Sequence, residues 1–264
     1  MIWAPTGNPA IVTPRGSDAP VREGPCLDAV DAAKVRAAEL ASRRPMVADP
    51  YAGALLDGLG VAGRDEDCDP ELSAVVAART KWFDEFLVAA GAGGLAQVVV
   101  LAAGLDTRPW RLPWLADTVV YEVDRPHVLA YKSETMRAAG ENTRIEYVPV
   151  PVAADVDWSK SLRAGGFDPC EPTVWAVEGV LPALPDGAWN PLFDQISLLS
   201  TRGSRIAVDA GEPTVEDIGN ALCCRGWEIT AFDARALMGR YHRETGHTGR
   251  LPSTAGGFIE GRLG

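Results

Sequence analysis

Acidic side chains recur at or near the ends of short apolar runs in the second half of the sequence. The runs are TVVYEVD, IEYVPVPVAAD, TVWAVEGV and SRIAVDA, and their acids are Asp124, Asp155, Glu178 and Asp209. Each run has the length and the β-branched content of a buried strand. In an open parallel sheet ligands bind beyond the carboxyl ends of the strands, so four acids there would form a negative rim suited to a cationic or hydroxyl-rich ligand. Any one of these acids alone is better explained as a helix cap or as part of a solvated turn, and it is the four together that favour a ligand site.

The run QVVVLAAG at 97–104 ends in small residues. Ala102, Ala103 and Gly104 would let the backbone approach a ligand closely. Asp124 follows Gly104 by about 20 residues, which is the spacing of the acid that binds a ribose diol in dinucleotide-binding folds. The sequence lacks GxxxxGK[ST] and the full GxGxxG spacing, so a phosphate cradle is not indicated. The turn and the acid therefore fit nucleotide binders and adenosylmethionine binders alike.

The elements that would position these residues alternate between strand and helix from residue 97 onward. Strand segments are expected at 97–104, 118–124, 145–155, 173–180, 204–210, 227–233 and 256–263, and helices at 126–139, 187–201, 214–225 and 234–241. Such alternation is typical of a parallel sheet whose strands are buried on both faces. We therefore expect an α/β fold with a seven-stranded, mostly parallel sheet and helices on both faces.

The first 90 residues have a different character. Residues 1–25 are rich in proline and glycine, which predicts an extended or flexible N-terminal arm. The stretches 27–43 and 70–90 have apolar residues at helical spacing. We therefore expect residues 26–90 to form a helical N-terminal attachment or cap, followed by a Rossmann-like domain over 91–264.

Composition limits the class of protein further. The chain has 264 residues and a formal net charge of −11, with no basic stripe, so a nucleic-acid partner is not expected. It has no apolar run of ~18 residues and no signal peptide pattern, which favours a cytoplasmic protein without a membrane partner. The cysteines form no CxxC pair, and the histidines are scattered, so we expect neither a disulfide framework nor a metal site.

Six segments of the sequence carry a family resemblance. They are LASRRPMVADPYAGALL, AARTKWFDEFL, VVVLAAGLDTRPWRL, TVVYEVDRPHVLAYKSETM, PVAADVDW and VWAVEGVL. In this order they resemble the S-adenosylmethionine-dependent methyltransferases related to leucine carboxyl methyltransferase, and most of all the large actinobacterial branch of O-methyltransferases in that family. The resemblance covers residues 27–240. It implies the class I methyltransferase form of the Rossmann-like fold and S-adenosyl-L-methionine as cofactor.

The resemblance also implies which residues would hold the methionine half of the cofactor. Arg79, in the ART stretch, would bind the methionine carboxylate, and a bidentate guanidinium suits that role. Arg36 is a second candidate for the same carboxylate. Glu178 would lie near the ammonium or sulfonium end. The alternative for Arg79 is a surface ion pair with Glu85 or Asp84 on the same helix.

The adenosine half would lie along the first turn and the next two strand ends. By the same resemblance, Ala102 and Gly104 would let the cofactor lie against the turn. Asp124 would accept both ribose hydroxyls. Asp155, together with the backbone of Val156, would contact the edge of the adenine.

Two departures from the family pattern leave other functions open. Ala102 stands where relatives have the first glycine of LGAG, and Ala183, in EGVLPALP, stands where relatives commonly have the tyrosine of EGVLxYL. A degenerate protein that binds S-adenosylmethionine without turnover is therefore one alternative. A nicotinamide-dependent oxidoreductase is another, because Asp124 would serve its ribose equally well.

The chemistry of the acceptor depends on whether a base is present. Methyl transfer is an in-line displacement in which alignment is the main task of the protein. A carboxylate acceptor is already ionised at neutral pH, whereas a phenol or an alcohol needs a general base. Tyr241 and His242, after the sixth strand, are weak candidates for a catalytic role, and no catalytic residue is assigned. We therefore expect O-methylation of a small-molecule carboxylate or acidic hydroxyl, and a homodimer stays open.

Overall fold

The computed structural model describes residues 27–61, 70–153, 156–181, 184, 189–210, 215–243 and 256–264. The predicted N-terminal arm, residues 1–25, lies outside these ranges. Among the helices that the structure describes, none combines the length and the apolar character needed to cross a membrane.

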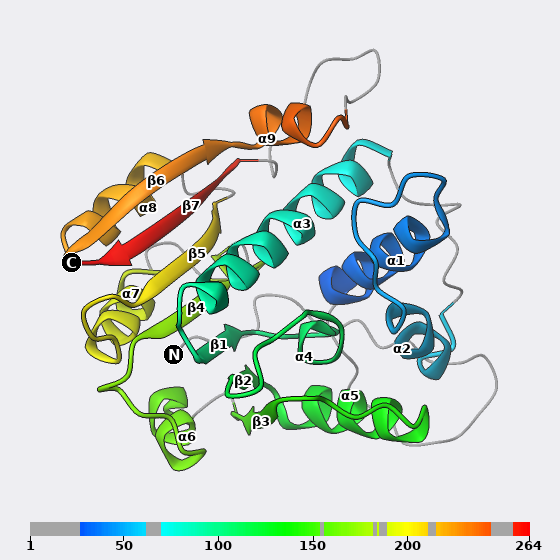
Figure 1. Cartoon of the computed structure of the whole chain (residues 1–264), viewed down its shortest axis with the longest axis horizontal. Helices are drawn as coiled ribbons and strands as arrows, with labels where there is room; N and C mark the ends of the chain where they lie inside the picture. The colour runs from blue at the N-terminus through cyan, green and yellow to red at the C-terminus, as the bar shows by residue number, and fades with distance from the viewer. Residues whose placement is uncertain are drawn as a thin grey trace.

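A seven-stranded sheet forms the centre of the molecule (Figure 1). Its strands are β1 (Gln97–Leu101), β2 (Val119–Asp124), β3 (Glu146–Pro151), β4 (Thr173–Val177), β5 (Arg205–Ala210), β6 (Trp227–Asp233) and β7 (Gly257–Leu263). They lie in the order β3-β2-β1-β4-β5-β7-β6. Strands β1 to β5 pair in parallel, and β7 runs antiparallel between β5 and β6. The predicted α/β fold and all seven predicted strand segments are confirmed.

The order of the strands locates the place where a ligand would bind. The chain moves outward from β1 through β2 to β3, then returns to the other side of β1 with β4. In open α/β sheets ligands bind at such a switch point, beyond the carboxyl ends of the strands. The loops after β1 and β4 are therefore expected to border the ligand site.

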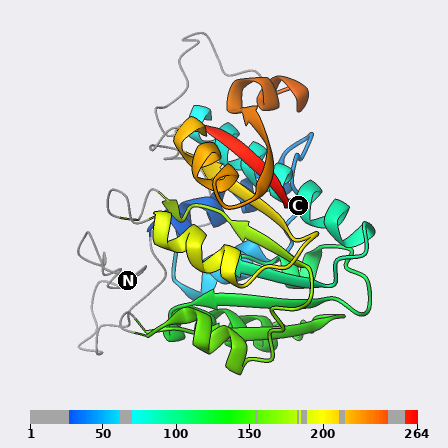
Figure 2. The same ribbon diagram turned by 90° about the vertical axis from the view of Figure 1, so that its left-hand side faces the viewer.

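Helices cover both faces of the sheet (Figure 2). Apolar side chains of α3 (Pro70–Ala92) and α9 (Ala234–Arg240) pack with one face, where Val98 and Val100 of β1 lie. The other face, with Val99 and Leu101, packs against α6 (Trp158–Ala164), α7 (Trp189–Leu198) and α8 (Val215–Cys223). Successive side chains of a strand point to opposite faces, so a strand covered on both sides must be apolar throughout. This is why β1 reads QVVVL.

Three short helices lie outside the helical segments expected above from the sequence. They are α2 (Ala52–Gly58), α4 (Arg108–Arg111) and α6. Each spans seven residues or fewer, which is too short for a helical period to stand out. The sequence held one usable signal, because the side chain of Asp157 caps α6 by accepting the N–H of Ser159.

The N-terminal helices divide between two locations. Helix α3 belongs to the sheet layer, because Phe83 and Phe86 share a core with Val98. Helices α1 (Leu27–Ala41) and α2 instead build a small core of their own, which includes Leu105 from the loop after β1. They therefore pack over the carboxyl end of β1. The predicted boundary between residues 26–90 and 91–264 stays a prediction.

Candidate functional site

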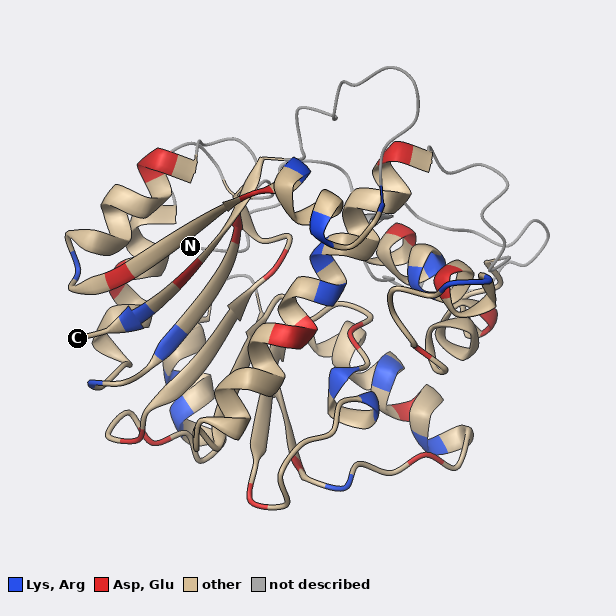
Figure 3. Ribbon diagram, turned by 45° about the horizontal axis from the view of Figure 1, so that its top comes forward, with Lys and Arg blue, Asp and Glu red and all other residues tan. Residues whose placement is uncertain are grey.

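Charged side chains converge where β1, β4 and β5 end beside α3. Figure 3 shows acidic positions at the ends of several strands and basic positions on the neighbouring helix. Ion pairs connect these charges in one continuous group, which we call the ion-pair network. It consists of four arginines and five carboxylates, namely Arg36, Arg79, Arg108, Arg111, Asp49, Asp84, Asp106, Glu178 and Asp209.

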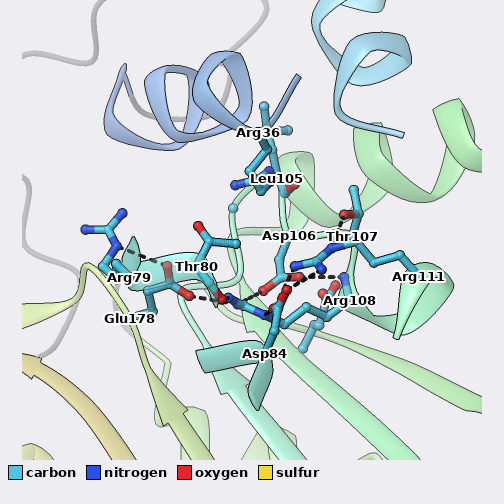
Figure 4. Close-up of polar contacts among 12 residues, drawn as sticks. Arg36, Arg79, Thr80, Asp84, Leu105, Asp106, Thr107, Arg108, Arg111 and Glu178 are labelled. Atoms are coloured by element: carbon cyan, nitrogen blue, oxygen red, sulfur yellow. Dashed lines mark hydrogen bonds and ion pairs between the residues drawn. The ribbon is translucent and has the colours of Figure 1, made fainter. Parts of the chain in front are cut away.

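Arg79 bridges the ends of two strands. Its Nε donates to Oε1 of Glu178 at 3.0 Å, and its Nη1 donates to Oδ2 of Asp209 at 3.3 Å. The other oxygen of Asp209 accepts the N–H of Gly179 at 2.8 Å. In Figure 4 the outer nitrogens of Arg79 point away from Glu178, and 22% of the side chain is exposed. The guanidinium is therefore partly open to a ligand, although one of its outer nitrogens is held by Asp209.

The alternative for Arg79, a surface ion pair with Asp84 or Glu85, is not the pairing that forms. Arg79 points to the strand ends, whereas Asp84 pairs with arginines of α4 and Glu85 pairs with Lys81. Burial raises the pKa of Asp209, the charge of Arg79 lowers it, and Glu178 raises it again, so that the net shift is upward. Burial alone would lower the pKa of Arg79, but Asp209 and Glu178 raise it above its ordinary value. Arg79 therefore stays charged.

Arg108 makes the most ion pairs of the network arginines, and no role was predicted for it. Its side chain is 3% exposed, and it donates to Asp84 from α3, to Asp106 from its own turn and to Glu178 from the end of β4 (Figure 4). Burial would raise the pKa of Asp106, but Arg108 and further positive charges lower it to about 2. The available signal was the arginine of GLDTRPWRL, which belongs to the family motif.

Arg36 lies at the opposite end of the network. Its Nε donates to Asp49 at 2.7 Å, and its Nη2 donates to the carbonyl oxygen of Leu105 at 2.7 Å. Asp49 also accepts the hydroxyl of Thr107 at 2.7 Å. Burial would raise the pKa of Asp49, but Arg36 and Arg111 lower it. Arg36 thus ties α1 to the loop after β1, and it does not lie beside Arg79.

The turn after β1 and the acid at the end of β2 come together as expected. The carboxylate of Asp124 accepts the N–H of Gly104 and the N–H of Arg125, both at 2.6 Å. Gly104 has a φ of +50°, and a Cβ there would lie 2.9 Å from the Cβ of Ala29, so glycine is required. Ala102 has a φ of +52°, in the region that glycine favours.

The remaining predicted residues are placed as follows. Asp155 and Ala183 lie outside the described residues. Val156 is exposed, and its N–H donates to the carbonyl oxygen of Ala153 at 3.1 Å. Tyr241 donates its hydroxyl to Glu85 at 2.6 Å, and His242 is exposed just after α9. Neither Tyr241 nor His242 belongs to the ion-pair network.

A second polar cluster, not predicted from the sequence, is buried on β2. Lys132 of α5 (Pro126–Ala138) lies 2.5 Å from Glu122, and both side chains are fully buried. The hydroxyl of Tyr147 donates to the same carboxylate at 2.7 Å. Burial raises the pKa of Glu122 to about 7 although Lys132 opposes the rise. This cluster connects β2, β3 and α5.

Comparison with known proteins identifies the family and agrees with the fold. Residues 29–197 match the family model described as leucine carboxyl methyltransferase. The chain is 46% identical over 236 residues to a protein of Mycolicibacterium gilvum (strain PYR-GCK) named "Putative S-adenosyl-L-methionine-dependent methyltransferase", covering 89% of this chain and 92% of that one. It is 42% identical over 229 residues to a protein of the same name from Mycobacterium sp. (strain MCS), covering 84% and 93%.

A solved structure confirms the fold independently. The crystal structure of a methyltransferase from Thermobifida fusca YX, described as putative, aligns with a TM-score of 0.50 at 16% identity, over 91% of this chain and 95% of that one. At this identity the likeness bears on the fold alone. The family assignment rests on the matched model and on the mycobacterial relatives. The chain is a member of the leucine carboxyl methyltransferase family, and it is an S-adenosyl-L-methionine-dependent methyltransferase.

Proposed function

We propose that this methyltransferase transfers the methyl group to an oxygen atom of a small molecule in the cytoplasm. The acceptor would be a carboxylate or an acidic hydroxyl. The described residues fit the cofactor at both of its ends. Arg79 would offer the methionine carboxylate the part of its guanidinium that Glu178 and Asp209 leave open, with Glu178 beside it for the ammonium or sulfonium. Asp124, oriented by two backbone N–H groups, would accept from the ribose hydroxyls.

The charge of the site supports this placement. The ion-pair network holds five carboxylates and four arginines, so it carries one negative charge in excess. S-adenosylmethionine has two positive groups and one carboxylate, and its net charge is therefore positive. A negative site attracts such a ligand, and the attraction is strongest where water is excluded. A polyanionic ligand would be repelled.

One observation carries the choice of acceptor. The hydroxyl of Tyr241 is committed to Glu85, and neither Tyr241 nor His242 belongs to the ion-pair network, so neither candidate base lies among the residues expected to hold the cofactor. An acceptor that is already ionised needs no base, and a carboxylate or an acidic hydroxyl meets this condition. The family model is itself named for methylation of a carboxyl group.

The chain's own part in the reaction is alignment. When bound, the cofactor supplies an electrophilic methyl group on a sulfonium. Arg79 and Asp124 would fix the two ends of the cofactor, which leaves the methyl group in one place relative to the sheet edge. Glu178 would stabilise positive charge near the sulfur before transfer. No proton has to move when the acceptor oxygen is an anion.

The proposal is tested with methyl-labelled S-adenosylmethionine and a panel of carboxylic acids, phenols, alcohols and amines. We expect labelled esters or aryl ethers, and a rate on carboxylates that stays flat from about pH 6 to 9, because a carboxyl group titrates near pH 4. Transfer to nitrogen would contradict the proposal. So would transfer to an unactivated alcohol that Tyr241→Phe or His242→Asn abolishes. Tight cofactor binding without any product would instead support a binding protein without turnover.

A further inference from the structure

Arg108 holds three carboxylates that come from three separate elements. Its Nε lies 2.6 Å from Asp84, and its Nη1 lies 2.5 Å from Asp106 and 2.7 Å from Glu178. The carbonyl oxygen of Thr80 accepts from its Nη2 at 3.3 Å. Only an arginine has a planar fork with enough donors to make these contacts at once. The first residue of α4 thereby fixes α3, the turn after β1 and the end of β4 relative to one another.

The two carboxylate oxygens of Glu178 accept from two different arginines. Arg79 donates to Oε1, whereas Arg108 donates to Oε2 (Figure 4). This division matters because a guanidinium and a carboxylate prefer a bidentate pair with two parallel hydrogen bonds. With Oε2 held by Arg108, Arg79 reaches Glu178 through Nε alone. Without Arg108, both oxygens of Glu178 would be open to Arg79.

We propose that Arg108 is a positioning residue for the methionine half of the cofactor. By holding Oε2 of Glu178, it prevents a bidentate Arg79–Glu178 pair that would occupy the guanidinium edge needed by the methionine carboxylate. The inference rests on the proposed function, since it takes Arg79 and Glu178 as contacts of that half. Arg108 itself touches no cofactor atom in this scheme.

The test separates this role from a purely structural one by comparing two probes. S-adenosylhomocysteine has both halves of the cofactor, whereas 5′-methylthioadenosine lacks the amino acid half. The dissociation constants of both are measured by calorimetry for the full chain and for Arg108→Lys. Lysine keeps the positive charge but has no fork that reaches all three carboxylates. We expect S-adenosylhomocysteine to bind about tenfold more weakly, the scale of one hydrogen bond to a charged group, and 5′-methylthioadenosine to bind as before.

Arg111→Lys is the matched control. Arg111 lies on the same short helix and also pairs with Asp84, but its other contacts are with Thr107 and Asp49, not with Glu178. It should leave the ratio of the two dissociation constants unchanged. Arg108→Gln provides a second variant at the same position. Both Arg108 variants are purified in the presence of 5′-methylthioadenosine, because a bound ligand stabilises the native state by mass action. In a Glu178→Gln background, Arg108→Lys should no longer change the ratio, because the residue through which it acts is neutral.

Three results would overturn the positioning role. They are equal weakening of both probes by Arg108→Lys, a selective effect of Arg111→Lys of the same size, and a full effect of Arg108→Lys in the Glu178→Gln background. A further variant, Arg79→Met, shows whether only the positioning role of Arg108 is wrong or whether the proposed cofactor site is wrong as well. If Arg79→Met selectively weakens S-adenosylhomocysteine while Arg108→Lys does not, only the positioning role is lost. If Arg79→Met changes neither constant, the proposed site itself is wrong.

Discussion

Arg79 of α3 and Glu178 at the end of β4 are joined by a hydrogen bond of 3.0 Å across 99 residues of sequence. One belongs to a helix that precedes the sheet, and the other to the strand beside the topological switch point. The site is therefore assembled from elements that meet only after the sheet has formed. Its geometry depends on how α3 packs on the sheet, which the core around Phe83 and Val98 determines.

Arg79→Met should weaken binding of S-adenosylhomocysteine by about 1.5–3 kcal/mol, because a hydrogen-bonded charge partner of the methionine carboxylate is lost. Binding of 5′-methylthioadenosine, which has no such carboxylate, should stay the same. Calorimetry with both compounds measures the difference. Lys81→Met is the control, because Lys81 lies on the same helix and pairs with Glu85 instead of the strand-end acids. An equal loss for both compounds would show that Arg79 acts on the fold and not on the methionine half.

Asp124→Ala should weaken both compounds by about 1.5–3 kcal/mol, since both contain the ribose whose hydroxyls Asp124 would accept. Asp124→Ala should thus weaken both compounds, whereas Arg79→Met should weaken only S-adenosylhomocysteine. Asp233→Ala serves as control, because this acid caps α9 by accepting the N–H of Ala236 and should cost about 1 kcal/mol of stability without any loss of affinity. Unchanged affinity in Asp124→Ala would remove the proposed ribose contact.

The centre of the sheet was predictable because β1, β2, β4 and β5 are buried along almost their whole length and must be largely apolar, whereas the edge strands β3 and β6 are mostly exposed or half-buried. The strand ends were less predictable. The expected segment 97–104 extends beyond Leu101, where β1 ends. The strand ends there because Ala102 and Gly104 adopt positive φ values, which cannot be predicted from a run of small residues. The meeting of Asp124 with Gly104 was predictable from their spacing alone, since neighbouring parallel strands end at one edge.

The ion pairs of the network could not be predicted from the sequence. An arginine such as Arg108 has acids within reach on three elements, and the choice among them depends on burial and on the packing of α3 against α4. The same holds for Lys132, whose buried partner Glu122 lies on another element of the fold. Charge pairing across tens of residues has no periodic pattern in the sequence. Helical spacing does account for the pair of Lys81 with Glu85, but Arg79 on the same helix pairs with distant acids and not with Asp84.

Ala102→Gly should stabilise the fold by about 0.5–1 kcal/mol. An L-residue in the left-handed region costs roughly 1–2 kcal/mol, and glycine gives back about 0.5–1 kcal/mol through the larger entropy of its unfolded chain. Urea unfolding measures the change. Ala103→Gly is the control, because Ala103 has no positive φ and is buried in the core, so its replacement should destabilise. A destabilised Ala102→Gly would mean that the methyl group of Ala102 contributes packing that outweighs the strain.

The buried pair of Glu122 and Lys132 should make stability depend on pH. The pKa of Glu122 is raised from an ordinary value of 4.5 to about 7, mainly by burial. Between these two values the native state holds a proton that the unfolded chain has released. The contribution of Glu122 to stability is therefore present below about pH 4.5 and is lost as the pH rises through about 7.

Lys132→Met should enlarge this dependence. It removes the charge that opposes the rise in the pKa of Glu122, and at pH 8 it leaves a buried carboxylate without its partner, which costs about 3–5 kcal/mol. At pH 5 the loss should be smaller, because Glu122 can bind a proton and become neutral. Urea unfolding at both pH values measures the two losses. In the double variant with Glu122→Gln no titrating group remains at this position, so the extra loss at pH 8 should disappear. An equal loss at pH 5 and pH 8 in Lys132→Met would mean that Lys132 stabilises the fold through the packing of its methylene groups and not through its charge.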